Sequence, residues 1–370
     1  MSVLRIPKEV TAVVQSADSE PSDEMCKPFL SDSQSTTDNS EPSSCSEDVP
    51  SGEATSRSEG FAWTTERQFH DFRRRKILEK YPQIKSLMRP DAGFFPFCAL
   101  SMCTIWATMV VISVLDLSWT TTVVLAYTVS GTLNHSLQLA VHELSHYLWF
   151  PSKLANDALA VATNLCSGWP AALPFKRYHR DHHVFLGVDG MDPDLPTDWE
   201  AKFFSSAPLK LLFLILYPLF YSLRPLIFQP KMLDLPEAIN LSVVIMWDAM
   251  ILRVFGSKAL FFLVGGTFIG LGLHPLSGHF LAEHYSLFGE ESPETASYYG
   301  WINKIMYNAG YHVEHHDFPR IPGCKLPEVR RIAAEFYDDL PCHESWPGVL
   351  WKFVFDPCLT PFSRLKRKQR

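Results

Sequence analysis

The sequence lacks the short motifs that identify several common classes of enzyme. It contains no G-x-S-x-G nucleophile elbow, no Walker phosphate-binding loop and no G-x-G-x-x-G dinucleotide fingerprint after a strand. Its eight cysteines form no C-x-x-C pair, so the sequence implies neither a zinc ribbon nor a disulfide framework. The chemistry of this chain must therefore come from other residues.

A surplus of positive charge is also missing. The net charge is −7, and residues 1–60 account for it with twelve acidic and four basic residues. Residues 61–370 hold twenty-eight acidic and twenty-nine basic residues and are almost neutral. We expect no nucleic-acid partner, because no basic surface of the required strength is present.

The first sixty residues have few aromatic residues and many Ser, Thr, Asp, Glu and Pro residues. Such a segment cannot bury enough apolar surface to offset its ordering entropy, which predicts a disordered tail over residues 1–60. It has no apolar stretch of the kind found in secretory signal peptides. Ser2 stands where N-myristoylation needs glycine.

Two long uncharged runs follow this tail, at residues 94–115 and 119–141, separated by a turn at Asp116. Each is long enough to cross a hydrocarbon core of roughly 30 Å, so together they predict a transmembrane hairpin. Residues 65–89 read as one basic amphipathic helix leading straight into the first run, which places that side in the cytosol.

Three further apolar stretches occupy the middle of the chain, and only two of them can cross the membrane if all histidine clusters meet on one side. We assign residues 238–256 and 259–279 to a second hairpin and residues 208–228 to a helix on the membrane surface. The predicted fold is all-α and multi-pass, with two transmembrane helical hairpins, a histidine-rich cytosolic cap, and both termini in the cytosol.

Ten of the fourteen histidines fall into four short clusters. On a helix, positions i, i+3 and i+4 share one face, so each cluster can point its rings the same way. Neutral imidazole is a good ligand for transition metals, and eight or more imidazoles aimed at one place suggest two metal ions. The predicted ligands are His142, His146, His179, His182, His183, His284, His312, His315 and His316.

The other histidines have different predicted roles. His70 and His343 are expected on the surface, and His274 is expected to be structural. His135 lies on the same helix face as His142 but about 10 Å deeper, at a rise of roughly 1.5 Å per residue. It is expected to be a buried hydrogen-bonded residue or part of a cavity wall.

Acidic residues beside the clusters can hold a ligand histidine from another cluster through its second ring nitrogen. A solvated helix face is the alternative for each of them. The acidic candidates are Glu143, Asp181, Glu283, Glu314 and Asp317. His279 is a further candidate for such a supporting role. The region of Asp192, Asp194 and Asp198 is expected either behind the ligands or near the polar head of a substrate.

The H-E-L-S-H cluster alone matches the zinc protease signature, but a zinc protease has no use for two H-x-x-H-H clusters. A metal transporter would place its ionisable ligands inside the spans, whereas these clusters lie at span ends and in polar stretches. Two irons in a shell of imidazoles can activate dioxygen against an unactivated C–H bond of a lipid chain. Such chemistry needs no general base, so we predict no catalytic residue beyond the ligands.

Four segments carry a resemblance to a known family. They are F-K-R-Y-H-R-D-H-H at 175–183, D-G-M-D-P-D-L-P-T-D-W at 189–199, L-H-P-L-S-G-H-F-L-A-E-H-Y at 273–285 and G-Y-H-V-E-H-H-D-F-P-R-I-P-G at 310–323. They resemble the sphingolipid delta-4 desaturases, or dihydroceramide desaturases, of the membrane fatty acid desaturase superfamily. The resemblance implies a membrane desaturase domain over residues 61–370.

This resemblance implies an enzyme of the endoplasmic reticulum with a di-iron centre held by the histidines named above. The implied reaction inserts a trans double bond between carbons 4 and 5 of dihydroceramide and reduces O2 to water. Electrons would come from NADH or NADPH through cytochrome b5 and its reductase, which are separate proteins because the chain has no H-P-G-G haem motif. The main alternative is a carbon-4 hydroxylase that makes phytoceramide at the same site. Some desaturases carry an asparagine four residues before the histidine that corresponds to His284, where this chain has Phe280.

Overall fold

The computed structural model describes residues 60–289 and 292–368. The predicted disordered tail lies outside the described residues, apart from Gly60. The structure is mostly helical, which confirms the predicted all-α class. Its short strands form two parallel pairs, β1 (Ala62–Thr64) with β4 (Leu365–Arg367) and β2 (Ser297–Tyr298) with β3 (Cys342–His343).

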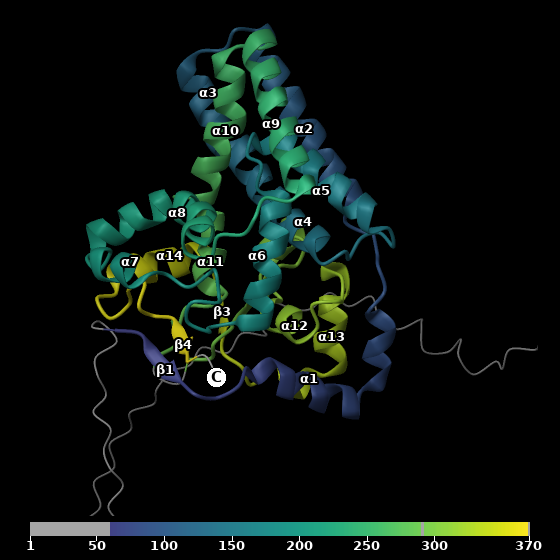
Figure 1. The fold of residues 1–370 in the computed structure, drawn as a ribbon, viewed down its shortest axis with the longest axis vertical. Helices are drawn as coiled ribbons and strands as arrows, with labels where there is room; N and C mark the ends of the chain where they lie inside the picture. Colours follow the sequence, from purple (N-terminus) through teal and green to yellow (C-terminus); the bar gives the residue numbers. More distant parts are fainter. Residues whose placement is uncertain (1–59, 290–291, 369–370) are drawn as a thin grey trace, which may run out of the picture.

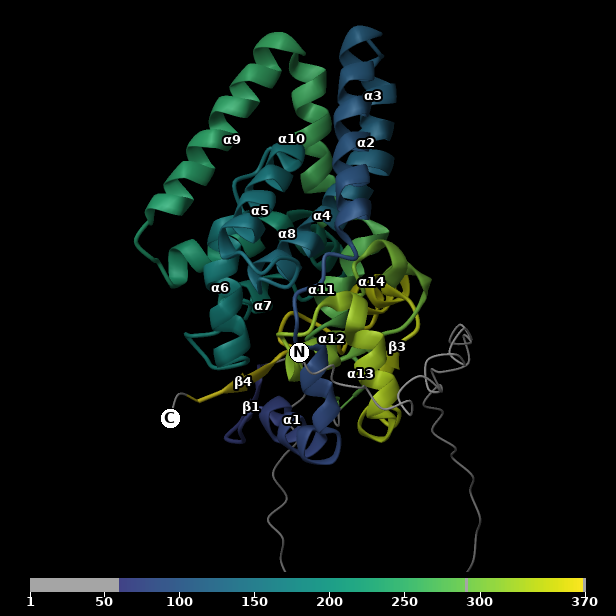
Figure 2. The ribbon, with the colours of Figure 1, turned by 90° about the vertical axis from the view of Figure 1, so that its right-hand side faces the viewer.

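Four apolar rods project together from one end of the molecule (Figures 1 and 2). The first is α2 (Phe95–Val114), and the second is a continuous helix made of α3 (Trp119–Leu125), a π-helical turn η4 (Ala126–Gly131) and α4 (Thr132–Ser145). The others are α9 (Leu235–Val254) and α10 (Ser257–Leu271). They correspond to the two predicted hairpins and make this a membrane protein.

The two hairpins meet where η4 crosses α10. A Cβ atom at Gly270 would lie 2.3 Å from the backbone oxygen of Gly131, and one at Gly266 would lie 2.2 Å from Oγ of Ser130. Only glycine, which has no Cβ atom, fits at these two positions of α10. Small residues allow the same close approach between other membrane helices. The close contact fixes α4, which carries two predicted ligands, against the second hairpin.

Helix α8 (Ala207–Phe228) contains Pro218 and Pro225 and lies across the direction of the four rods (Figure 1). By length and composition it is apolar enough to span a membrane, as are α2 and α9, and as is α10 if its bent continuation is included. Its crosswise orientation is the one that a helix on the membrane surface would have, as predicted for residues 208–228.

The predicted single helix over residues 65–89 is wrong. Helix α1 (Phe69–Lys80) ends before Pro82, and a 3-10 helix η3 (Pro82–Leu87) follows. Proline lacks a backbone N–H and disfavours the α conformation of the residue before it, which explains a break at Tyr81. Helix α1 lies at the end of the molecule opposite the four rods, beside α12 (His312–Asp317) and α13 (Leu326–Ile332) (Figures 1 and 2).

Candidate metal centre

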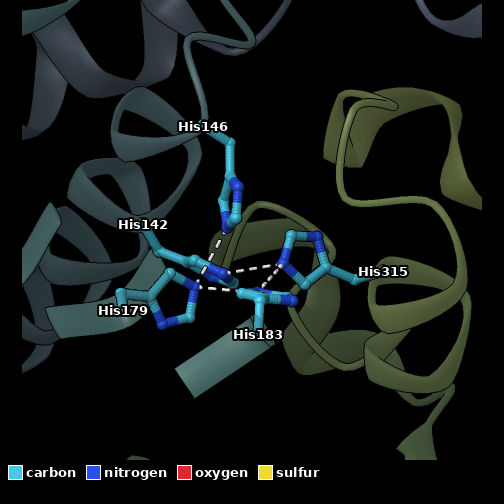
Figure 3. Close-up of side chains that lie close together, drawn as sticks. All are labelled: His142, His146, His179, His183 and His315. Carbon is cyan, nitrogen blue, oxygen red and sulfur yellow. Dashed lines mark hydrogen bonds between the residues drawn. The ribbon is translucent and has the colours of Figure 1, made fainter. Parts of the chain in front are cut away.

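Five histidines from three helices form the first group. His142 lies in α4 and His146 caps its C-terminal end, His179 and His183 lie in α6 (Ala172–Phe185), and His315 lies in α12. One ring nitrogen of each lies within 4.8 Å of those of the others. Figure 3 shows the five rings turned toward one another. Neighbouring Nε2 atoms are 2.9 Å apart for His142 and His315, 3.0 Å for His146 and His179, and 3.2 Å for His183 and His315.

Four histidines form a second group beside the first. Nε2 of His284, which follows α11 (Gly278–Ala282), lies 2.9 Å from Nε2 of His182 and 2.9 Å from Nε2 of His312. His316 completes the group, because its nitrogen lies within 4.8 Å of those of His182 and His284. The rings of His183 and His316 stack with their centroids 4.3 Å apart, so the two groups are adjacent.

Helix α6 and helix α12 each contribute to both groups. In α6, His179 and His183 are one turn apart and face the first group, while His182 faces the second. In α12, His312 and His316 are one turn apart and face the second group, while His315 faces the first. The H-x-x-H-H spacing therefore serves two sites from one short helix, and the structure brings all nine predicted ligands together.

The donor set fits two transition-metal ions. Burial, together with neighbouring imidazoles, lowers the pKa of His179, His183 and His315 well below the ordinary value, so these rings are neutral at pH 7. Neutral rings that turn their nitrogen lone pairs toward one point are arranged to bind a cation. Nε2 of His316 is buried without a hydrogen-bond partner among the described residues, and a metal ligand atom needs none.

The acid that holds a ligand most directly is Asp192, in the loop after α6. Its Oδ1 lies 2.9 Å from Nδ1 of His182, and both side chains are buried. The backbone N–H of Gly187 donates to its Oδ2 at 2.7 Å, which fixes the carboxylate. Glu283 lies farther from its histidine, with Oε1 at 3.5 Å from Nδ1 of His312.

Three other candidate acids bind groups other than ligand histidines within the described part of the chain. Glu143 accepts hydrogen bonds from the backbone N–H of Gly323 and the indole of Trp149. Glu314 accepts hydrogen bonds from the hydroxyls of Ser297 and Tyr299. Asp181 forms an ion pair with Lys231 at 2.6 Å. Glu143 and Glu314 hold the chain segments around the ligands rather than the imidazoles.

Asp317, the last residue of α12, lies at the centre of a buried network of hydrogen bonds and ion pairs. Its carboxylate lies 2.7 Å from Nδ1 of His70, accepts a hydrogen bond from Nε of Arg73 at 2.6 Å, and accepts a third from the hydroxyl of Tyr337 at 3.0 Å. The ring of His70 lies 5.0 Å from that of the ligand His316, centroid to centroid. Asp317 therefore ties α1 to the helix that carries three ligands.

Two histidines expected on the surface are buried. His70 is 6% exposed and held by Asp317, and His343 is 7% exposed with Nε2 at 3.1 Å from the backbone oxygen of Ala282. Their partners lie far away in the sequence, so local pattern gave no signal of burial. His279 contacts Nε2 of the buried His135 at 2.8 Å, and His274 caps the turn that follows α10.

A cavity of about 310 Å³ ends at the metal centre. Its wall consists largely of leucine, proline and aromatic side chains from α6, α8 and α9. Five ligand histidines line one part, namely His142, His179, His182, His284 and His312. Leu226 and Leu233, which also line it, are 50% and 61% exposed, so the cavity reaches the apolar surface between α8 and α9.

Fold and site together define a membrane protein in which buried histidines, arranged as metal ligands would be, lie beside a largely apolar cavity. The family model for fatty acid desaturases matches residues 117–346, and the model for sphingolipid Delta4-desaturases matches residues 57–92. The chain belongs to the fatty acid desaturase family, and within it to the sphingolipid delta(4)-desaturases. It is therefore an oxidoreductase.

The chain aligns with three curated relatives over almost the full length of each relative. The sphingolipid delta(4)-desaturase/C4-monooxygenase DES2 of Rattus norvegicus is 48% identical over 86% of this chain and 97% of its own length. The sphingolipid delta(4)-desaturase DES1 of Xenopus tropicalis is 47% identical over 84% of this chain and 95% of its own length. For DES1 of Homo sapiens the identity is 45%, over 84% and 96% respectively.

Proposed function

We propose that this protein is a sphingolipid delta-4 desaturase that converts dihydroceramide to ceramide by inserting a trans double bond between carbons 4 and 5 of the sphingoid base. The observation that carries the proposal is the convergence of nine histidines at the end of an apolar cavity that opens between α8 and α9. Identity of 45–48% with desaturases of this specificity supports the choice of substrate.

The two groups of histidines hold two iron ions in this proposal. With O2 as co-substrate, the bound irons supply the oxidising chemistry that removes hydrogen from an unactivated carbon. The residues of the chain place the substrate and keep the ligands in order. Asp192 fixes the ring of His182 with its Nδ1 turned away from the metal, which leaves Nε2 as the ligand atom.

The cavity orients the lipid. Its apolar wall receives the chain from the bilayer between α8 and α9, where leucines are exposed. A chain that moves from the bilayer to this wall stays in an apolar environment, so its entry does not require exposure to water. The closed wall beside the ligands also excludes bulk water from the reacting carbons.

The electrons come from NADH or NADPH through cytochrome b5 and its reductase, which act as separate proteins. The enzyme resides in the endoplasmic reticulum membrane with both termini in the cytosol. A common side for all the histidines is supported by α6, α11 and α12, which lie away from the tips of the four rods, and by the end of α4 that meets them (Figures 1 and 2).

A carbon-4 hydroxylase is the second candidate function. It is favoured by one observation, namely that the DES2 relatives of rat, mouse and human are named as both desaturase and C4-monooxygenase. The same site would deliver oxygen to carbon 4 in place of removing a second hydrogen.

The test is a product assay in microsomes from a host that lacks this activity, supplied with dihydroceramide, O2, NADH, cytochrome b5 and its reductase. Mass spectrometry of the sphingoid base should show a loss of two mass units, which His315→Ala abolishes. A gain of sixteen mass units would assign the hydroxylase. No change in mass would refute both functions.

A further inference from the structure

The position of the reaction restricts where the polar head of the substrate must bind. Carbon 4 is bonded to carbon 3, which carries a hydroxyl group, and the amide and second hydroxyl follow on carbons 2 and 1. If carbons 4 and 5 lie beside the metal centre, the two hydroxyls lie within a few ångströms of it. The groups that bind the head must therefore be next to ligand histidines rather than at the far mouth of the cavity.

Two carboxylates occupy that place. Asp194, in the loop after α6, and Glu283, at the end of α11, both line the cavity. Asp194 lies 3.6 Å from Nδ1 of His182, and Glu283 lies 3.5 Å from Nδ1 of His312. Both neighbours belong to the second group of histidines, so the two acids lie on the same side of the centre.

Among the described residues no hydrogen bond reaches either side-chain carboxylate, and each has a histidine ring nitrogen as its ion-pair neighbour at 3.5–3.6 Å. The hydrogen bonds from Gly187 and Asp194 at this loop go to the carboxylate of Asp192, not to that of Asp194. Asp194 and Glu283 keep 17% and 16% of their side-chain surface exposed, in a cavity whose wall is largely apolar but also includes the guanidinium of Arg364. Carboxylates in an apolar wall need donors, and a carboxylate accepts hydrogen bonds only.

We infer that Asp194 and Glu283 bind the two hydroxyl groups of the sphingoid head, one each, and thereby position carbons 4 and 5 at the metal centre. The inference rests on the proposed function, because it takes dihydroceramide as the substrate. It assigns to Asp192 and Asp194, which are two residues apart, different tasks: Asp192 holds a ligand, and Asp194 holds the substrate.

The test pairs isosteric variants with substrate analogues in the same microsomes. Asp194→Asn and Glu283→Gln are compared with wild type on dihydroceramide, on its 3-deoxy analogue and on its 1-deoxy analogue. Asp198→Asn is the matched control, since this neighbouring acid is 69% exposed and pairs with Lys366 instead. Iron per chain is measured for each purified full-length variant.

Because each substitution removes or rearranges a hydrogen bond that positions the substrate, each variant should lose about tenfold in kcat/KM on dihydroceramide. Each loss should disappear on the analogue that lacks the hydroxyl which that acid binds, while iron content and the control variant stay at the wild-type level. Losses that persist equally on both analogues, or a loss of iron in either Asp194→Asn or Glu283→Gln, would overturn the inference. Inactive wild-type enzyme would instead refute the proposed function.

Discussion

Replacing Asp192 by asparagine tests the role of a single carboxylate behind the metal centre. The carboxylate serves three donors: Nδ1–H of His182 at 2.9 Å and the backbone N–H of Asp194 at 2.9 Å on Oδ1, and the backbone N–H of Gly187 at 2.7 Å on Oδ2. An amide has one oxygen and one NH2 group, so it cannot accept from all three.

Each orientation of the amide has a cost. With its oxygen toward His182, the NH2 group meets the N–H of Gly187, and two donors face each other. With its oxygen toward Gly187, the NH2 group donates to Nδ1 of His182 and moves the ring proton to Nε2, the atom that the geometry turns toward His284. In that tautomer Nε2 has no lone pair with which to bind a metal ion.

We expect Asp192→Asn to weaken metal binding about 10- to 100-fold, the range for loss of such a supporting carboxylate, which corresponds to about 1.4–2.7 kcal/mol. The assay is retention of iron by the purified protein during titration with a chelator, with Asp198→Asn as control. If Asp192→Asn and Asp192→Ala both retain iron as wild type does, the reasoning about the tautomer of His182 is refuted.

Two further predictions concern stability and topology. Arg73→Met leaves the carboxylate of Asp317 buried without its guanidinium, so we expect a loss of about 3–5 kcal/mol and a clearly lower Tm in detergent. Arg74→Met breaks only an exposed pair with Asp71 and should leave Tm nearly unchanged; equal Tm shifts in the two variants would contradict the burial argument. In sealed microsomes, a membrane-impermeant maleimide should label the exposed Cys358 and not the Cys358→Ser variant, as peptide mass spectrometry can show. Cys324 should react slowly, because burial raises the pKa of its thiol to about 11. Labelling of Cys358 only after the membrane is permeabilised would place this part of the chain in the lumen.

The convergence of the nine histidines could be predicted because their signal is local. Spacing of i, i+3 and i+4 on one helix identifies each cluster, and four clusters require a common target. The long uncharged runs located both hairpins for a similar reason. The crosswise helix α8 needed the additional argument that an even number of crossings separates the clusters.

The supporting residues could not be predicted in the same way, because their partners are distant in the sequence. His70 and Asp317 are 247 residues apart, and nothing near His70 indicates that it is buried. Glu143 adjoins a ligand, yet it binds the backbone of Gly323. Asp192 was visible only as one of several acids after the second cluster, and the fold of the loop decides which of them reaches His182.

The pairing of β1 with β4 joins the first described strand of the chain to one of its last, with Ala62 opposite Leu365. During synthesis at about 5–20 residues per second, roughly 15–60 s separate the appearance of these two strands. His70 and Arg73 are synthesised almost as long before their partner Asp317. The ribosome therefore delivers both membrane hairpins well before the cap can close, and the two groups of histidines can meet only late in translation, once His316 has been made.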